Sequence, residues 1–244
     1  MKEDIKWKYS KNNLNFSKLD NEQSENNELL ENIDKIKKEE LKKIFDNTLN
    51  HKYDLYKKYL FEFNLFMFTE LEHNIKESVY CLMIGAHTAS ITNTNLILER
   101  ALKLALIQYE SGKLIDYSDN KLIKSYVESD KIISNKSIDK NIQKCQKYKM
   151  LNEEEATELK EYKLKYRDGF SHFTPRHILK GENRLFNKDE KSSIENYSNE
   201  DKLPPSQSIE IKQFAKNNSE NHLIYVLKVI NHLQFKVLEE FKNK

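Results

Sequence analysis

Apolar residues recur every three or four positions along most of this chain. This spacing is typical of amphipathic helices, because 3.6 residues complete one helical turn. The first such stripe begins near residue 28, among Glu and Lys, and its apolar members are Leu29, Leu30, Ile33, Ile36, Leu41, Ile44 and Phe45. The next run, residues 53–80, is richer in apolar and aromatic side chains. Charged segments flank it and favour a buried helix over a strand.

A long helix is predicted for the middle of the chain. Small residues at positions 85–90 begin it, and they would let a neighbouring helix approach closely. Leu98, Leu102, Ala105 and Tyr109 then recur at spacings of four, three and four, which assigns one face of this helix to the core. Gly112 is the predicted end of the helix. Residues 116–150 are expected to form two shorter helices.

The helix that follows has a clear start signal. Asn152 can cap it, Glu155 stands where a capping box requires it, and the neighbouring acids suit the helix dipole. Arg167 is expected at its C-terminal end and Gly169 at the departure from helix. Because Pro175 cannot donate a helical hydrogen bond, the residues just before it, His172 included, are expected in a turn or a first helical turn.

The remaining segments complete an all-α prediction. Residues 1–27 are polar and are expected to form a flexible or docking N-terminal arm. Residues 181–205 form one long polar loop, after which Ser206 or Ser208 would cap the last helix. The core stripe of that helix is Val226, Ile230, Leu233, Val237 and Phe241. Five or six helices would therefore surround one core in a single domain over residues 28–244.

Composition narrows the class of protein. Four glycines and three prolines in 244 residues are few for an all-β sandwich or a Gly-rich nucleotide fold. The formal net charge of +2 does not by itself indicate a nucleic-acid partner. Two isolated cysteines, Cys81 and Cys145, suggest free thiols in a reducing compartment. Without a signal peptide or an apolar run of membrane-spanning length, a cytoplasmic location with no membrane association is expected.

One short segment concentrates residues with catalytic potential. Arg167 is followed by Asp168 and, after four intervening residues, by His172. Arginine offers a planar fork of donors suited to phosphate, and histidine exchanges a proton near neutral pH. Such a pair can provide what metal-free phosphodiester cleavage requires.

This combination resembles the HEPN superfamily, small helical bundles that include many metal-independent ribonucleases of defence and toxin–antitoxin systems. Their signature is an Arg, four to six residues and a His, often with a polar residue directly after the Arg. The segment from Arg167 to His172 fits it, with Asp168 as the polar neighbour. Residues 98–103 look like the long acidic-apolar helix that lies beneath the motif in such bundles. The resemblance covers about residues 80–240, whereas the loop at 181–205 departs from the family pattern.

The resemblance implies an endoribonuclease that needs no metal ion or other cofactor. His172 would act as base or acid, Arg167 would hold the scissile phosphate, and Asp168 would orient one of them. The implied site is shared by two subunits of a homodimer and cleaves RNA through the 2′-hydroxyl. Further phosphate contacts are implied for Arg176, His177 and Lys180. A toxin or antiphage role, with a cognate antitoxin or regulatory partner, would follow.

Other interpretations stay open. The second is a non-catalytic HEPN-like module that binds a nucleotide, RNA or a protein, and the third is an unrelated helical scaffold. Taken alone, Arg167 can be interpreted as a cation that pairs with the helix dipole or with a nearby Glu. His172 can likewise be interpreted as a capping or core residue. Arg176 and His177 also read as plain surface residues. For Glu99, exposure on the polar face is favoured over burial as a partner of Arg167.

Overall fold

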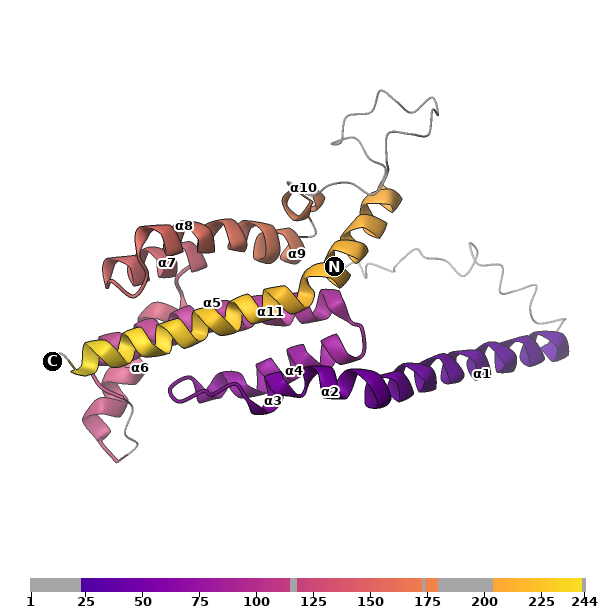
Figure 1. Cartoon of the computed structure of the whole chain (residues 1–244), viewed down its shortest axis with the longest axis horizontal. Helices are drawn as coiled ribbons and strands as arrows, with labels where there is room; N and C mark the ends of the chain where they lie inside the picture. The colour runs from indigo at the N-terminus through magenta and orange to yellow at the C-terminus, as the bar shows by residue number, and fades with distance from the viewer. Residues whose placement is uncertain (1–22, 115–117, 173, 180–203, 243–244) are drawn as a thin grey trace, which may run out of the picture. The chain divides into compact units, whose positions relative to one another are not determined.

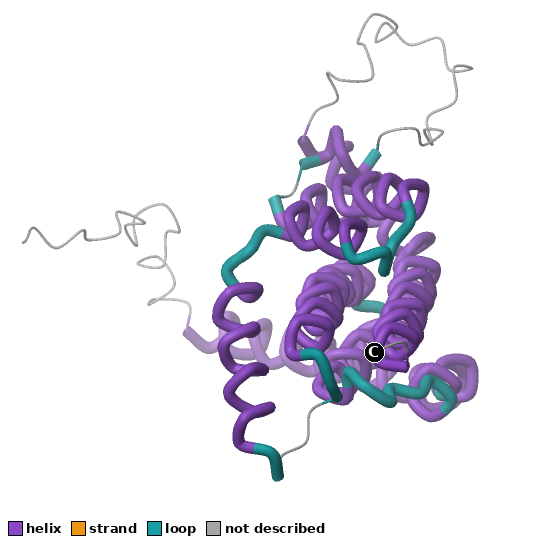
Figure 2. Tube along the Cα trace, turned by 90° about the vertical axis from the view of Figure 1, so that its left-hand side faces the viewer, coloured by secondary structure: helices purple, strands orange, loops and turns teal. Residues whose placement is uncertain are grey.

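The computed structural model describes residues 23–114, 118–172, 174–179 and 204–242. Helices account for nearly all of these residues, and no strand occurs among them (Figure 2). The predicted all-α class is therefore confirmed. No helix within the described ranges combines the length and the apolar character needed to cross a membrane.

The helices divide into two compact units, residues 1–52 and residues 53–244. In the first unit lie α1 (Gln23–Asn47) and the π-helical turn η2 (Thr48–Lys52). The elements of the second unit are α2 (Tyr53–Tyr56), α3 (Lys58–Phe61), η3 (Thr69–Leu71), α4 (Glu72–Met83), α5 (His87–Ser111), α6 (Asn120–Ser134), α7 (Ile138–Lys147), α8 (Glu153–Tyr162), η4 (Lys163–Asp168), α9 (Gly169–Ser171), α10 (Pro175–Ile178) and α11 (Pro204–Lys242). The predicted arm at residues 1–27 falls mostly outside the described residues, and the predicted boundary at residue 28 stays a prediction.

Helix α5 is the central element of the second unit. It runs alongside α11 and also contacts α4, α6 and α7 (Figure 1). Because neighbours cover it from several directions, it is apolar around most of its circumference, and Leu98, Leu102 and Leu106 are at most 1% exposed. The large side chains of this core are fully buried, so their removal would leave cavities.

Small polar residues join α4 to α5. The Ser78 and Thr94 hydroxyls lie 2.6 Å apart, and the Ser90 hydroxyl donates to the Ser78 carbonyl at 3.0 Å. All three residues are completely buried. Their short side chains let the two helices approach closely, and their mutual hydrogen bonds offset the cost of burying hydroxyl groups.

Several predicted boundaries are confirmed. Gly112 ends α5 in the left-handed region at φ 79°, and the two helices expected within residues 116–150 are α6 and α7. The capping box at the start of α8 is complete, because Asn152 and Glu155 each accept a hydrogen bond from the other's backbone amide at 2.8 Å. These local signals act within one turn, so they are readable from sequence.

Three boundaries differ from the prediction. Residues 62–68 interrupt the helix expected over 53–80, and the side-chain oxygen of Gln234 accepts hydrogen bonds from the Met67 and Phe68 amides there. Helix also continues through Gly169, which has helical dihedrals. Finally, α11 begins at Pro204 and not at the predicted serines, because a helix start tolerates a residue without an amide donor.

The left-handed glycine gives a stability prediction. In Gly112→Ala, the new methyl group meets no atom within 4 Å, so only the positive φ is unfavourable. The free energy of unfolding should fall by about 1 kcal/mol. Gly112→Asn should lose less, because Asn tolerates this conformation better. Chemical denaturation measures both variants, and equal losses would contradict this explanation.

Candidate functional site

The predicted motif lies on a continuous helical segment with an unusual turn. Helix α8 continues into the π-helical turn η4, which contains Arg167, and then into α9, which His172 terminates. A π-helix brings residues five positions apart onto one face, whereas an α-helix separates them by about 140°. Lys163 and Asp168 have this spacing, and their side chains meet at 2.7 Å. The π-helical turn therefore creates an ion pair beside Arg167.

Asp168 accepts contacts from two cations. One of its carboxylate oxygens pairs with Lys163, and the other accepts a hydrogen bond from Arg167 Nη1 at 2.9 Å. Burial opposes ionisation of Asp168, but the hydrogen bonds from Lys163 and Arg167 outweigh it, so the pKa of Asp168 lies below its ordinary value. Asp168 therefore stays a carboxylate that holds the Arg167 guanidinium by a hydrogen bond.

Helix α5 supplies a second carboxylate to Arg167. Glu99 Oε2 lies 3.6 Å from Arg167 Nη2, and Glu99 also pairs with Lys103 at 2.9 Å. With a side chain 24% exposed, Glu99 is the partly buried partner of Arg167 and not the exposed polar residue that the sequence favoured. The prediction that Glu99 is exposed was wrong, because the local sequence does not show which element packs against the polar side of α5.

The charges around Arg167 alternate in sign across three elements. Lys163 completes the series by pairing with Asp139 of α7 at 2.9 Å, so that three acidic and three basic side chains are linked. The series is Asp139, Lys163, Asp168, Arg167, Glu99 and Lys103. Such a network fixes the position of Arg167 and neutralises much of its charge.

Beneath the motif, a buried hydrogen-bond relay holds the backbone of η4. Asn95 of α5 is 3% exposed, and its Nδ2 donates to the Tyr166 carbonyl at 3.0 Å. Its Oδ1 therefore accepts, so His222 Nε2 of α11, 3.0 Å away, carries the proton. This fixes one neutral tautomer of His222 and leaves its buried Nδ1 without a hydrogen-bond partner among the described residues.

Aromatic rings surround this relay. The ring of His222 stacks on Tyr166 with centroids 4.2 Å apart and planes 4° apart. Tyr162 stacks on Tyr166 at 4.6 Å and on Tyr225 at 3.8 Å. Burial lowers the pKa of His222 to about 3, because its charged form would lose hydration without gaining an acceptor. The motif thus rests on a buried aromatic layer shared by α8, η4, α5 and α11.

The predicted site residues are only partly brought together. Arg167 contacts Asp168, and its side chain is 33% exposed; His172 is exposed at the end of α9. Arg176 is exposed on α10, and His177 beside it is half-buried. Lys180 lies outside the described residues.

A close contact docks α10 against the motif segment. A methyl group at Gly169 would lie 2.8 Å from Ile178 Cγ1 and 3.6 Å from the Cβ of His177, so only glycine permits this approach. Glycine is therefore used here for space, since its φ is helical. The contact places Arg176 and His177 on the helix directly adjoining the one that ends at His172.

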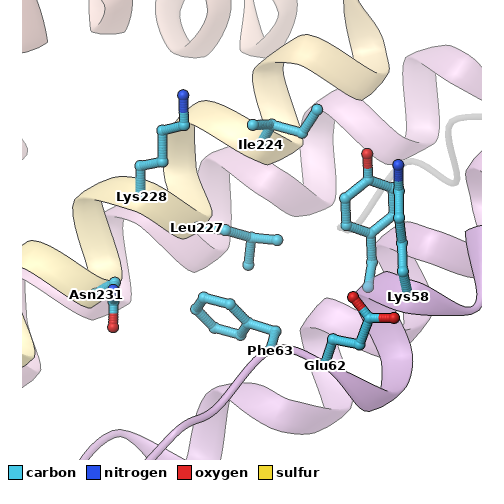
Figure 3. A pocket seen from close by; sticks show the side chains of 8 residues that line it. Lys58, Glu62, Phe63, Ile224, Leu227, Lys228 and Asn231 are labelled. Atoms are coloured by element: carbon cyan, nitrogen blue, oxygen red, sulfur yellow. The ribbon is translucent and has the colours of Figure 1, made fainter.

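A groove lies away from the motif, between other elements of the second unit. It has a volume of about 300 Å³ and separates the α3 region from α11 (Figure 3). Its lining residues are Lys58, Tyr59, Glu62, Phe63, Ile224, Leu227, Lys228 and Asn231. Arg167 and His172 are not among them.

Sequence reasoning missed the supporting residues Asn95, Lys163 and His222. A five-residue spacing between Lys163 and Asp168 is not an α-helical contact, so the pair gives no signal until the π-helical turn is known. Asn95 and His222 stand 127 positions apart and meet only in the folded chain.

Comparison of the chain with protein-family models, curated proteins and solved structures found no match.

The buried His222 predicts a pH dependence of stability. Its pKa is lower in the folded state than in the unfolded state, so its contribution is complete above about pH 6.5 and is lost as the pH falls toward 3. In this window the free energy of unfolding should fall by up to about 1.4 kcal/mol per pH unit from this residue alone. Chemical denaturation at several pH values in this range should show that the free energy of unfolding of His222→Phe falls less steeply with decreasing pH than that of wild type.

A matched control is His73→Phe, because the His73 side chain is 80% exposed. This variant should keep the wild-type slope. Identical slopes in wild type and His222→Phe would show that His222 does not titrate on unfolding as proposed.

Proposed function

We propose that the chain is a metal-independent endoribonuclease of HEPN type, acting as a toxin or antiphage effector in the cytoplasm. The observation that carries this proposal is the ordered Arg167–x4–His172 segment, whose two functional side chains both reach solvent. Rigid support favours catalysis, because a catalytic group must be held in position before the substrate binds. Asn95, Tyr166 and His222 provide that support directly beneath Arg167.

The chemistry follows from the two side chains. A base removes the proton from the RNA 2′-hydroxyl, the 2′-oxygen attacks phosphorus, and the bond to the 5′-oxygen breaks as an acid protonates that oxygen. Arg167 would bind the phosphate and stabilise its developing charge. The products are a 2′,3′-cyclic phosphate and a 5′-hydroxyl. DNA lacks the nucleophile, so RNA is the substrate.

A single motif supplies one histidine, although the reaction needs both a base and an acid. Two subunits that present their motifs to one cleft would supply both, with His172 as one group and the partner subunit's His172 as the other. Arg176 and His177 on the adjoining α10 would contact flanking phosphates, together with Lys180. The proposed assembly is therefore a homodimer, restrained by an antitoxin or another regulatory partner.

One observation favours the alternative, a non-catalytic module that binds a nucleotide, RNA or a protein partner. Arg167 already pairs with Asp168 and Glu99, as a purely structural arginine would. RNA binding without cleavage would identify this function.

Cleavage of labelled single-stranded RNA in excess EDTA tests the proposal. Wild type should leave cyclic-phosphate ends, and His172→Ala and Arg167→Ala should each lower the rate by about 100-fold or more. His73→Ala removes an exposed histidine from α4 and should retain full activity. Intact RNA with wild type under all conditions, or equal cleavage by His172→Ala, would refute the ribonuclease.

The Glu99 carboxylate gives a separate prediction about affinity. It competes with a phosphate for Arg167, so Glu99→Gln should tighten binding of nucleic acid by about two- to fivefold. Single-stranded DNA of the same sequence is a suitable probe, because it cannot be cleaved, and fluorescence anisotropy measures its binding. Glu70→Gln is the matched control, because Glu70 pairs with a different arginine, Arg100, at 2.6 Å. Weaker binding by Glu99→Gln would mean that Glu99 positions Arg167 instead.

A further inference from the structure

Helix α1 carries several large apolar side chains that are exposed within the first unit. Ile33, Ile36, Leu41 and Ile44 are between 42% and 57% exposed. A helix of 25 residues gains little stability from its backbone alone and normally needs its apolar face buried. Exposed large apolar side chains gathered on one side of a helix point to a binding surface.

This side of α1 has charged residues at its centre. Ile33, Lys37, Glu40 and Ile44 follow one another at spacings of four, three and four, so they lie along one face of α1. Ile36 flanks this face on one side, and Leu41 flanks it on the other. Lys37 and Glu40 pair with each other at 2.9 Å, with side chains 69% and 56% exposed. We call this surface, Ile33 to Ile44, the α1 face.

The α1 face is symmetric about the point between Lys38 and Glu39. A second copy of α1, turned end for end about that point, would place Ile33 level with the partner's Ile44. Lys37 would then be level with the partner's Glu40, and Ile36 with the partner's Leu41. Each apolar residue is thus at the same height as an apolar residue of the partner, and each charged residue is at the same height as a residue of opposite charge. Self-complementarity of this kind is what a two-fold symmetric interface requires.

We propose that the α1 face is an interface between two copies of this chain, formed by antiparallel pairing of their α1 helices. An apolar partner surface would leave Lys37 and Glu40 desolvated with only each other as partner, which is costly. A second copy supplies each of them with an additional opposite charge. A parallel pairing would instead place like charges level with each other. This interface does not rest on the proposed ribonuclease activity, because Arg167 and His172 belong to the other unit.

Sedimentation of the full-length chain over a range of concentrations tests the pairing. Wild type should dimerise. Lys37→Glu and Glu40→Lys should each raise the dimer dissociation constant by about tenfold or more, because each creates two like-charged contacts in an antiparallel pair. An equimolar mixture of these two variants should form heterodimers with nearly wild-type affinity, since opposite charges are then level again.

The mixture separates the interface from an effect within one helix, because each variant alone also breaks its own Lys37–Glu40 pair. Lys35→Glu is the matched control: it changes net charge as Lys37→Glu does but lies on the opposite side of α1, so it should dimerise like wild type. Circular dichroism would check that helix content is retained. A monomeric wild type at every concentration, or single variants that dimerise as tightly as wild type, would overturn the proposal.

Discussion

The hydrogen bond from Asn95 to the Tyr166 carbonyl ties the motif-bearing segment to the central helix of the second unit. Because α5 is the central, largely buried helix of this unit, the Asn95 amide fixes the position of the η4 backbone. His222 orients the amide from the opposite side and stacks on Tyr166, so that three elements meet at one residue. Losing any one of these contacts would leave polar groups unsatisfied in a buried layer.

Above this layer, the alternating charges fix the position of the Arg167 side chain but also occupy its hydrogen-bond donors. Pairing with Asp168 and Glu99 orders the guanidinium, but it also means that an arriving phosphate must compete with carboxylates. The site would therefore bind nucleic acid less tightly than its count of basic residues suggests. Such moderation is compatible with a toxin or effector that must not act on every RNA it meets, and equally with a binding module.

The two units carry different surfaces through which copies of the chain could associate. A composite ribonuclease site would require that the motifs of two chains come close together, and those motifs lie in the second unit. The α1 face lies in the first unit and is self-complementary by its own sequence. Pairing through α1 would hold two copies of the second unit at high effective concentration, which favours any weaker contact between them.

Local signals in the sequence determined the all-α class, the end of α5 at Gly112 and the capping box at Asn152. Each of these depends on side chains within a turn or two of one another. Only the tertiary structure decided that Glu99 pairs with Arg167 and that Asn95, Tyr166 and His222 form one buried layer. Those contacts join residues far apart in the chain, and the π-helical turn that pairs Lys163 with Asp168 changes the helical period on which sequence reading depends.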